Sequence, residues 1–162
     1  MSDELLDDPR LTAVGLLAET FIGLMNRLTA QLETHGLSGI AFEVLLRLAR
    51  SPGNRLRMSD LAAQTSLSTS GATRVVDRME RDGLVTRTPC PTDRRSSYAV
   101  VSEAGMALLH EALPGHLELV ERWFTGQLDP AALRALLDGL RTVRDAIHPD
   151  AVAGAAAETD GT

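Results

Sequence analysis

The stretch "RLRMSDLAAQTSLSTSGATRVVDRMERDGLV", residues 55–85, decides the fold. It predicts two short helices about four residues apart. The first is capped by Ser59, and the second is capped by Ser68 or Thr69. Gly83 supplies the left-handed residue at which the second helix ends. Because the second helix begins with small polar residues and has one narrow apolar face, the pattern is typical of a helix-turn-helix.

The residues that follow predict a β-hairpin. Its strands are "LVTRTP" (84–89) and "YAVVS" (98–102), joined by "CPTDRRSS" (90–97) as a longer loop. The loop carries two adjacent arginines, Arg94 and Arg95. A helix-turn-helix followed by a hairpin is a winged helix, so the predicted fold class is mainly α with a small β-hairpin (α+β).

Amphipathic helices flank the winged helix on both sides. Apolar residues recur with helical spacing over residues 11–32 and again over 133–147. Ser38, Ser102 and Asp129 are predicted to cap the helices that follow them. The outer helices have more apolar surface than the winged helix can cover, and we therefore expect a second copy of the chain to cover it.

The charge of the chain is unevenly distributed. The 162 residues carry a formal charge of -6, and all 16 basic residues are arginine. Residues 50–97 nevertheless hold nine arginines against five acidic residues, a net of +4. A basic segment between acidic flanks indicates a polyanion-binding module, although chance clustering on a solvated face gives the same count.

The composition and motifs of the chain argue against several other classes of protein. No apolar run approaches the roughly 18 residues of a membrane span, and the acidic N-terminus lacks signal-peptide features. A single cysteine cannot form an internal disulfide and fits a cytoplasmic protein. Four scattered histidines do not have metal-ligand spacing, and no phosphate-binding loop or nucleophile elbow is present. We therefore expect no enzyme activity, no cofactor, no metal and no membrane partner.

The sequence resembles the MarR family of bacterial winged-helix transcription regulators. The resemblance rests on "LSGIAFEVLLRLARSPG" (37–53), on "RMSDLAAQTSLSTSGATRVVDRMERDGLV" (57–85), and on "DRR" (93–95) followed by "VVSEAG" (100–105). It implies a homodimer with intertwined terminal helices that represses transcription from an inverted-repeat operator in double-stranded DNA. It also implies release by a small-molecule effector, often aromatic or anionic, that binds between the dimerisation helices and the DNA-binding lobe.

In this family pattern the second helix of the helix-turn-helix enters the major groove, and the hairpin, or wing, reaches the minor groove. Small residues at the start of the helix let its N–H and hydroxyl groups approach phosphates, and Arg74 suits a bidentate contact to guanine. The alternative is that Ser68 merely caps the helix and Arg74 is a solvated arginine. The predicted DNA contacts are Ser68, Thr69, Ser70, Gly71, Thr73, Arg74, Arg78, Arg94 and Arg95.

The wing residues have different implied roles. Arg95 is the side chain inserted into the minor groove, where A·T-rich stretches concentrate negative potential, and Arg94 lies nearer the DNA backbone. The resemblance gives Asp93 the role of bracing the wing through a salt bridge, with Arg78 or Arg95 as its partner. The equally strong alternative is a turn in which Asp93 bonds to its own backbone.

The effector pocket is the least specific part of the pattern. The resemblance places it among residues that are interpreted equally well as core or surface. Cys90 lies between two prolines, and we interpret it as a small structural residue rather than as a redox switch. The pocket residues are Met25, Leu28, Leu32, His35, Phe42, Leu46 and Arg47.

The sequence therefore predicts a DNA-binding transcription regulator, with a winged-helix module for protein–protein assembly as the alternative. The predicted divisions are a disordered N-terminus (1–9), an N-terminal dimerisation helix (10–36), the winged helix-turn-helix DNA-binding domain (37–102), C-terminal dimerisation helices (103–148) and a disordered tail (149–162).

Overall fold

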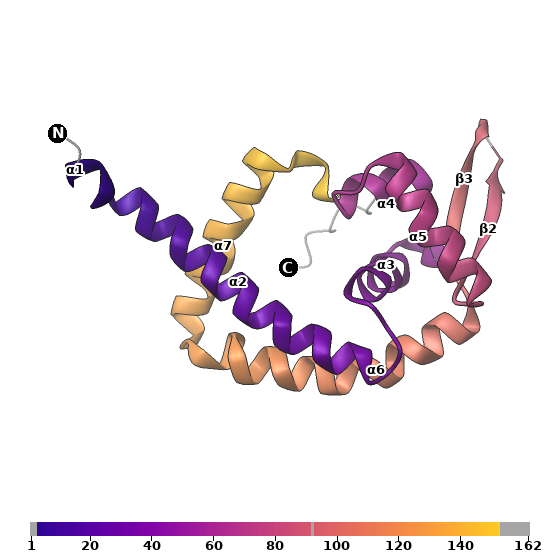
Figure 1. Cartoon of the computed structure of the whole chain (residues 1–162). Coiled ribbons are helices and arrows are strands. Elements are labelled where there is room, and N and C mark those ends of the chain that lie inside the picture. The colour runs from indigo at the N-terminus through magenta and orange to yellow at the C-terminus, as the bar shows by residue number, and fades with distance from the viewer. Residues whose placement is uncertain (1–2, 92, 153–162) are drawn as a thin grey trace.

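The computed structural model describes residues 3–91 and 93–152, and it is mainly helical with one small sheet (Figure 1). This confirms the predicted fold class. The α-helices are α1 (Asp3–Leu6), α2 (Pro9–Glu33), α3 (Gly39–Ala49), α4 (Met58–Gln64), α5 (Thr69–Arg81), α6 (Glu103–Trp123) and α7 (Pro130–Ile147). The 3-10 helices are η1 (Pro52–Asn54), η2 (Thr125–Gln127) and η3 (Pro149–Val152), and the strands are β1 (Arg55–Arg57), β2 (Val85–Cys90) and β3 (Asp93–Val101).

The sheet is antiparallel, with strand order β1-β3-β2. Strand β3 begins at Asp93, so the predicted longer loop over residues 90–97 is wrong, and Arg94 and Arg95 lie in the strand. A register shift between Pro89 and Cys90 pairs Cys90 with Asp93. The shift leaves residues 94–96 of β3 without a partner on β2, so Arg95 lies in an irregular part of the hairpin near its tip.

Side-chain caps fix the start of most helices. Backbone N–H groups donate to Ser38 Oγ (3.3 Å), to Ser68 Oγ (3.0 Å) and to Ser102 Oγ (3.0 Å), as the sequence predicts. Asp129 caps α7 in the same way. The predicted cap at Ser59 is wrong, because α4 begins at Met58, directly after strand β1, with Arg57 at the N-cap position and no side-chain cap. Ser59 Oγ instead lies 3.4 Å from Asp60 Oδ1.

One apolar core holds the winged helix together. Leu45 and Leu48 of α3 pack with Leu61 of α4, Val76 of α5 and Val85 of β2, and all five side chains are buried. The core therefore fixes α5 and the base of the wing to the same centre. Ile40 and Leu46 of α3 lie at the edge of this core and are only half-buried.

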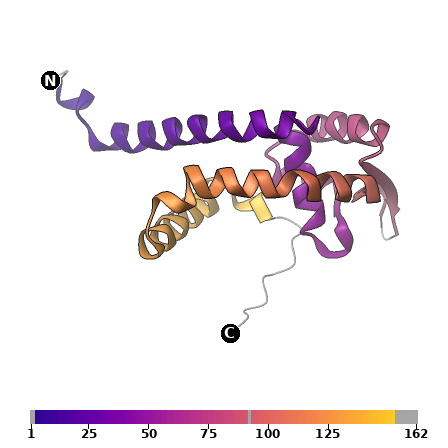
Figure 2. The same cartoon turned by 90° about the horizontal axis from the view of Figure 1, so that it is seen from below.

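Helix α6 connects the winged helix to the C-terminal helices. It runs without a break past Pro114 and packs beside α2 (Figure 2). Gln31 Nε2 of α2 donates to the Ala112 carbonyl of α6 at 3.1 Å, so the two helices are joined by a polar contact as well as by apolar packing.

The outer helices expose apolar surface. An 18-residue window of α2 has a mean hydropathy of 1.2 and is only 6% buried, which makes this helix long and apolar enough, by length and composition, to cross a membrane. The expectation that no segment approaches such a length is therefore wrong for α2. The exposed apolar residues include Leu11, Val14, Leu17, Phe21, Ile22, Leu136, Leu140, Val143 and Ile147.

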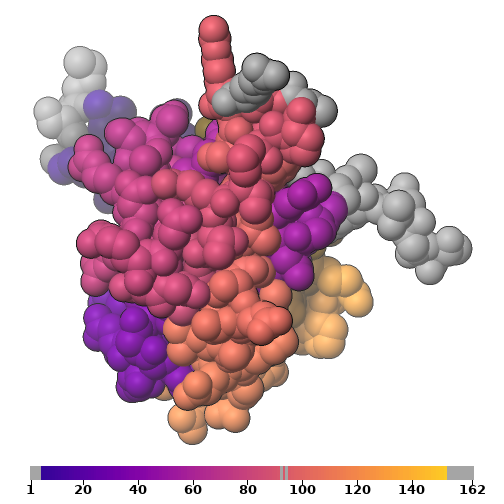
Figure 3. Space-filling model, turned by 90° about the vertical axis from the view of Figure 1, so that its right-hand side faces the viewer, coloured from indigo at the N-terminus to yellow at the C-terminus, as the bar shows by residue number. Residues whose placement is uncertain are grey.

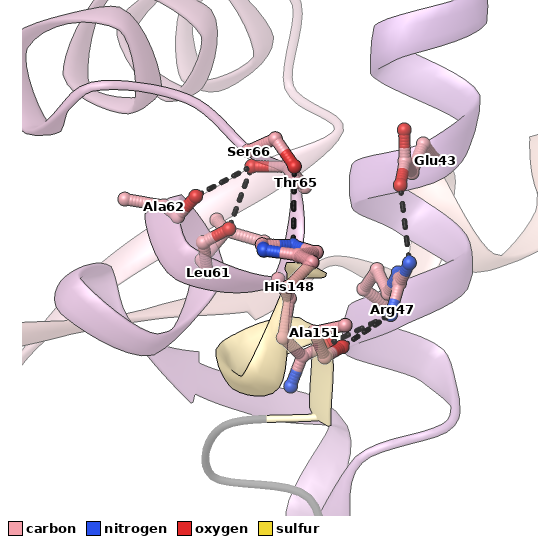
Figure 4. A network of polar contacts seen from close by, with 9 residues as sticks. Glu43, Arg47, Leu61, Ala62, Thr65, Ser66, His148 and Ala151 are labelled. Carbon is pink, nitrogen blue, oxygen red and sulfur yellow. Dashed lines mark hydrogen bonds and ion pairs between the residues drawn. The ribbon is translucent and has the colours of Figure 1, made fainter. Parts of the chain in front are cut away.

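The chain ends differ from the predicted disordered segments 1–9 and 149–162. Residues 3–6 form α1, and α2 begins at Pro9. Residues 149–152 form η3, where Ala151 is buried and its carbonyl accepts a hydrogen bond from Arg47 Nη1 at 2.9 Å (Figure 4). These tertiary contacts have no periodic signal in the sequence. Residues 1–2 and 153–162 of the predicted disordered segments lie outside the described residues.

Gly105 gives a stability prediction. A Cβ at this position would lie 2.1 Å from the Leu84 carbonyl oxygen, so Gly105→Ala is expected to lower the free energy of unfolding by about 2–3 kcal/mol. At Gly139 no described atom lies within 4 Å of a new Cβ, and Gly139→Ala is expected to raise it by about 0.5–1 kcal/mol. Urea unfolding followed by circular dichroism, at equal protein concentration, measures both. Equal effects of the two substitutions contradict the prediction.

Candidate nucleic-acid interface

Helix α5 and the wing lie on the same side of the molecule (Figures 1 and 3). The hairpin projects beyond the rest of this face, and α5 lies next to its base. The first three residues of the predicted recognition site, Ser68, Thr69 and Ser70, are exposed. The structure thus brings the start of α5 and the wing to one accessible surface.

Several hydroxyl groups at the start of α5 are used within the helix. Ser68 Oγ accepts from the Gly71 amide at 3.0 Å and lies 3.2 Å from Ser70 Oγ. Thr73 Oγ1 donates to the Thr69 carbonyl at 2.9 Å. Ser68 is therefore an N-cap, and its hydroxyl helps to hold the first turn in shape.

Arg74 and Arg78 are exposed on α5, and neither side chain makes a hydrogen bond or ion pair with any described residue. They border a cavity of about 320 Å³ between α5 and the start of α3, with Leu37, Ile40 and Met79 among its other lining residues. Two unpaired guanidinium groups on one helix face leave positive charge available to an anion.

Asp93 does not make the predicted salt bridge. Its Oδ1 accepts from the Arg95 backbone amide at 2.9 Å, and neither Arg78 nor Arg95 pairs with its carboxylate. The alternative in which Asp93 bonds to its own backbone is the one observed. The carboxylate consequently shapes the wing tip while the Arg95 side chain stays exposed. The Arg94 side chain lies outside the described part of the chain.

A cleft of about 530 Å³ separates the wing from the starts of α4 and α5. Thr69 and Thr73 line it from α5, and Arg95 lines it from β3. Three of the predicted DNA contacts therefore surround one open space. The remaining lining residues are Met58, Ser59, Arg87, Asp93, Ser96 and Ser97.

Sequence reasoning missed the role of Arg87, which it counts only as one of the basic residues. Its guanidinium lies 2.6 Å from Asp77 Oδ1, so this arginine of β2 is bonded to α5. The available signal was the pair of acidic residues, Asp77 and Glu80, three apart on a helix that otherwise carries arginines.

The predicted effector-pocket residues separate into two places. Leu28, Leu32 and Phe42 are buried where α2, α3 and α6 meet, with Met25 and Leu46 half-buried. His35 Nδ1 of the α2–α3 connection lies 3.4 Å from Glu111 Oε1 of α6.

Arg47 lies elsewhere, because its guanidinium bonds Glu43 Oε1 at 3.2 Å, the Ala151 carbonyl at 2.9 Å and Gln64 Oε1 at 3.5 Å (Figure 4). It connects α3 with α4 and η3 rather than lining a pocket with His35.

His116 belongs to the same junction of α2, α3 and α6, and the sequence did not single it out there. Its ring centroid lies 4.4 Å from that of Phe42, and its Nδ1 is buried with no hydrogen-bond partner among the described residues. Gln31 Oε1 is a second buried atom of this kind. Burial lowers the pKa of the His116 imidazole. The junction thus combines apolar walls with two unpaired polar atoms.

Comparison with known proteins gives a consistent result. A family model described as "MarR family" matches residues 35–96. The chain is similar to AbsC, a MarR family transcriptional regulator from Streptomyces coelicolor, with 33% identity and a TM-score of 0.82 over 88% of this chain and 96% of that one. It is 28% identical to Sco3205 from the same organism, a MarR family transcriptional regulator solved in complex with DNA, with a TM-score of 0.72 over 83% and 88% of the two chains.

Two further findings concern ligands and coverage. CouR from Rhodococcus jostii RHA1, solved bound to p-coumaroyl-CoA, is 26% identical with a TM-score of 0.71 over 88% of this chain and 95% of that one. The chain also matches curated transcriptional regulators and repressors of Bacillus subtilis and Escherichia coli, and these matches span 51% to 68% of their lengths.

His116 makes stability depend on pH. Because burial lowers the pKa of His116 in the folded state, the unfolded chain binds a proton more readily, and stability is expected to fall as the pH drops below about 6.5. His116→Phe keeps the ring contact with Phe42 but removes the titrating group, so its stability should fall less over the same range. Urea unfolding of both proteins between pH 8 and pH 5.5 measures the difference, and the other three histidines are common to both. Parallel pH curves would show that His116 does not contribute.

Proposed function

This chain belongs to the MarR family of DNA-binding transcription regulators, a family without enzyme activity, and from that premise we propose that it is a homodimeric repressor of an inverted-repeat operator. The observation that carries the proposal is the single exposed face that joins the start of α5 to the wing. We further propose that it acts in the cytoplasm, where it meets DNA.

Helix α5 is proposed to enter the major groove. Exposed small residues at its start allow close approach, and an N-terminal helix end favours phosphate through its free N–H groups. Arg74 lies one turn further on with an unpaired guanidinium, which supports a contact to guanine. Arg78, also unpaired, is assigned to phosphate.

The wing is proposed to lie over the adjacent minor groove with Arg95 inserted. Support comes from the position of Arg95 near the tip of the projecting hairpin, from its exposed side chain, and from the Asp93 hydrogen bond that orders the tip without neutralising the guanidinium. A free cation on a narrow ribbon suits a groove in which the negative potential is concentrated.

A second copy of the chain is proposed to cover the apolar faces of α2, α6 and α7. Phe21 of α2 is 62% exposed, Leu117 of α6 is 58% exposed and Ile147 of α7 is 78% exposed, values that a stable monomer seldom leaves over so large an area. Residues 10–36 and 103–148 would then be the dimerisation helices, and residues 37–102 the DNA-binding domain.

The effector is proposed to bind at the junction of α2, α3 and α6. Buried apolar walls at Leu28, Leu32 and Phe42 suit an aromatic group, while the unpaired Gln31 Oε1 and His116 Nδ1 offer polar anchors. The relative CouR, solved with p-coumaroyl-CoA, supports an aromatic and anionic class of ligand. Arg47 is left out of the proposed pocket because its bonds lie towards α4 and η3.

Two arginine substitutions test the DNA contacts. Arg95→Ala is expected to weaken binding to the operator and to lower the salt slope by about one unit, whereas Arg74→Ala should relax the preference for one base pair by about 1–3 kcal/mol. Fluorescence anisotropy measures both on a duplex selected from a random library by the wild-type protein, at several salt concentrations.

Arg134→Ala removes the same charge from α7, outside α5 and the wing, and it is the control once sedimentation equilibrium shows that this variant remains a dimer. Wild-type affinity in both test variants would contradict the DNA interface and favour the protein–protein assembly module.

The dimer has its own test. Phe21→Glu places a charge on the exposed apolar face of α2, so it is expected to raise the dimer dissociation constant at least about tenfold. Thr12→Glu is the matched control, because nine helical residues place Thr12 on the opposite side of α2. Sedimentation equilibrium measures both. A wild-type protein that is monomeric at micromolar concentration would contradict the proposal.

A further inference from the structure

We infer that Arg87 is a positioning residue that sets the distance between the wing and helix α5. The inference rests on the proposed function, because it concerns how the two DNA-contacting elements are held in register. Arg87 lies on β2, near the base of the wing, and its side chain crosses to α5.

Arg87 makes several bonds to the helix at once. Its Nη1 lies 2.6 Å from Asp77 Oδ1 and 3.7 Å from Glu80 Oε2, and its Nη2 donates to the Thr73 carbonyl at 3.3 Å. The planar guanidinium therefore bridges positions that are spread over two turns of α5, which fixes the strand along the helix axis as well as towards it.

The backbone of Arg87 adds to this attachment. Strand β2 is at one edge of the sheet, and the Arg87 amide donates to Glu80 Oε1 at 3.1 Å. A carboxylate of α5 thus takes up an edge N–H group that would otherwise be open to another strand. Glu80 consequently holds both the side chain and the main chain of the same residue.

We call the contacts of Arg87 with Thr73, Asp77 and Glu80 the Arg87 clamp. Beyond this clamp, towards the wing tip, the wing and the start of α5 are separated. The cleft of about 530 Å³ lies between Thr69 and Thr73 on one side and Arg95 on the other. Among the described residues, no hydrogen bond or ion pair joins the Arg95 side chain to α5. The angle of the wing tip relative to α5 is therefore controlled from its base, where Arg87 lies.

The side chains of Arg87 and its two acidic partners are partly exposed, as expected for an ion-pair link between two elements at the surface. The side chain of Arg87 is 28% exposed, against 47% for Asp77 and 41% for Glu80. Because Arg87 also lines the cleft, a direct contact of its guanidinium with a DNA phosphate is the competing explanation.

The direction in which Asp77→Asn changes the DNA affinity separates the two explanations. If Arg87 positions the wing, Asp77→Asn loosens the clamp and weakens DNA binding. If Arg87 binds phosphate itself, Asp77→Asn frees the guanidinium and removes a repelling charge, so binding becomes tighter. Asp82→Asn is the matched control, because it removes the same charge from the end of α5 without contacting Arg87.

A double-mutant cycle with Arg95 gives the quantitative test. In the wild-type background Arg95→Ala is expected to weaken binding to the selected duplex by about tenfold. In an Arg87→Met background the same substitution should cost less than about twofold, because a wing that is not held in place no longer delivers its arginine to the groove. Fluorescence anisotropy on the full-length protein measures all four forms, and thermal unfolding verifies that each is folded.

In an Asp77→Asn background, Arg95→Ala should likewise weaken DNA binding by less than it does in the wild-type protein. This second background keeps the test available if Arg87→Met does not fold. Arg87→Lys, which can keep one ion pair but not the bridge, should give an intermediate cost. An equal cost of Arg95→Ala with and without Arg87, or tighter binding by Asp77→Asn than by Asp82→Asn, overturns the inference. Failure of the wild-type protein to bind any duplex would instead overturn the proposed function.

Discussion

The winged helix is attached to the rest of the molecule where α5 ends and α6 begins. Gly83 takes a left-handed conformation with φ of 75°, which turns the chain from α5 into β2. Ser102 then donates from its hydroxyl to the Gly83 carbonyl at 2.7 Å and from its amide to the Leu84 carbonyl at 3.0 Å. Gly105 lets α6 approach this backbone more closely than any side chain would permit. Helix α5, both wing strands and α6 therefore meet at one closely packed corner.

This corner explains why local sequence signals predict the fold so well. The glycine after α5, the serine before α6 and the apolar spacing of both helices act through neighbours in the chain, and such contacts are visible in the sequence. The caps at Ser38, Ser68 and Ser102 were found for the same reason. The prediction of a cap at Ser59 was wrong because strand β1 already fixes Arg57, which pairs with Tyr98, and the helix begins where the strand ends.

The site itself was less visible because a count of charges does not show which charges are free. Arg87 is held by Asp77 and Glu80, and Arg55 lies 4.7 Å above the ring centroid of Tyr98. Arg74 and Arg78 have no partner among the described residues. The net of +4 over residues 50–97 thus mixes arginines that pair within the domain with arginines whose side chains remain unpaired. Only tertiary pairing separates the two groups: the spacing of Asp77 and Glu80 indicates an acidic face on α5, but it does not identify Arg87 of β2 as the partner of that face.

A second attachment joins the C-terminal helices to the winged helix. After α7 the chain returns to the winged helix, where Ser66 Oγ, just after α4, lies 3.1 Å from His148 Nε2 and Arg47 of α3 bonds to the Ala151 carbonyl. Helix α7 is therefore linked to the helix-turn-helix directly through η3 as well as through α6. Two attachments on different helices restrict rotation far more than one does. A shift of α7 in the proposed dimer would consequently act on α4 and, through the shared core, on α5, so that the spacing of two wings along one duplex follows from how the terminal helices pack.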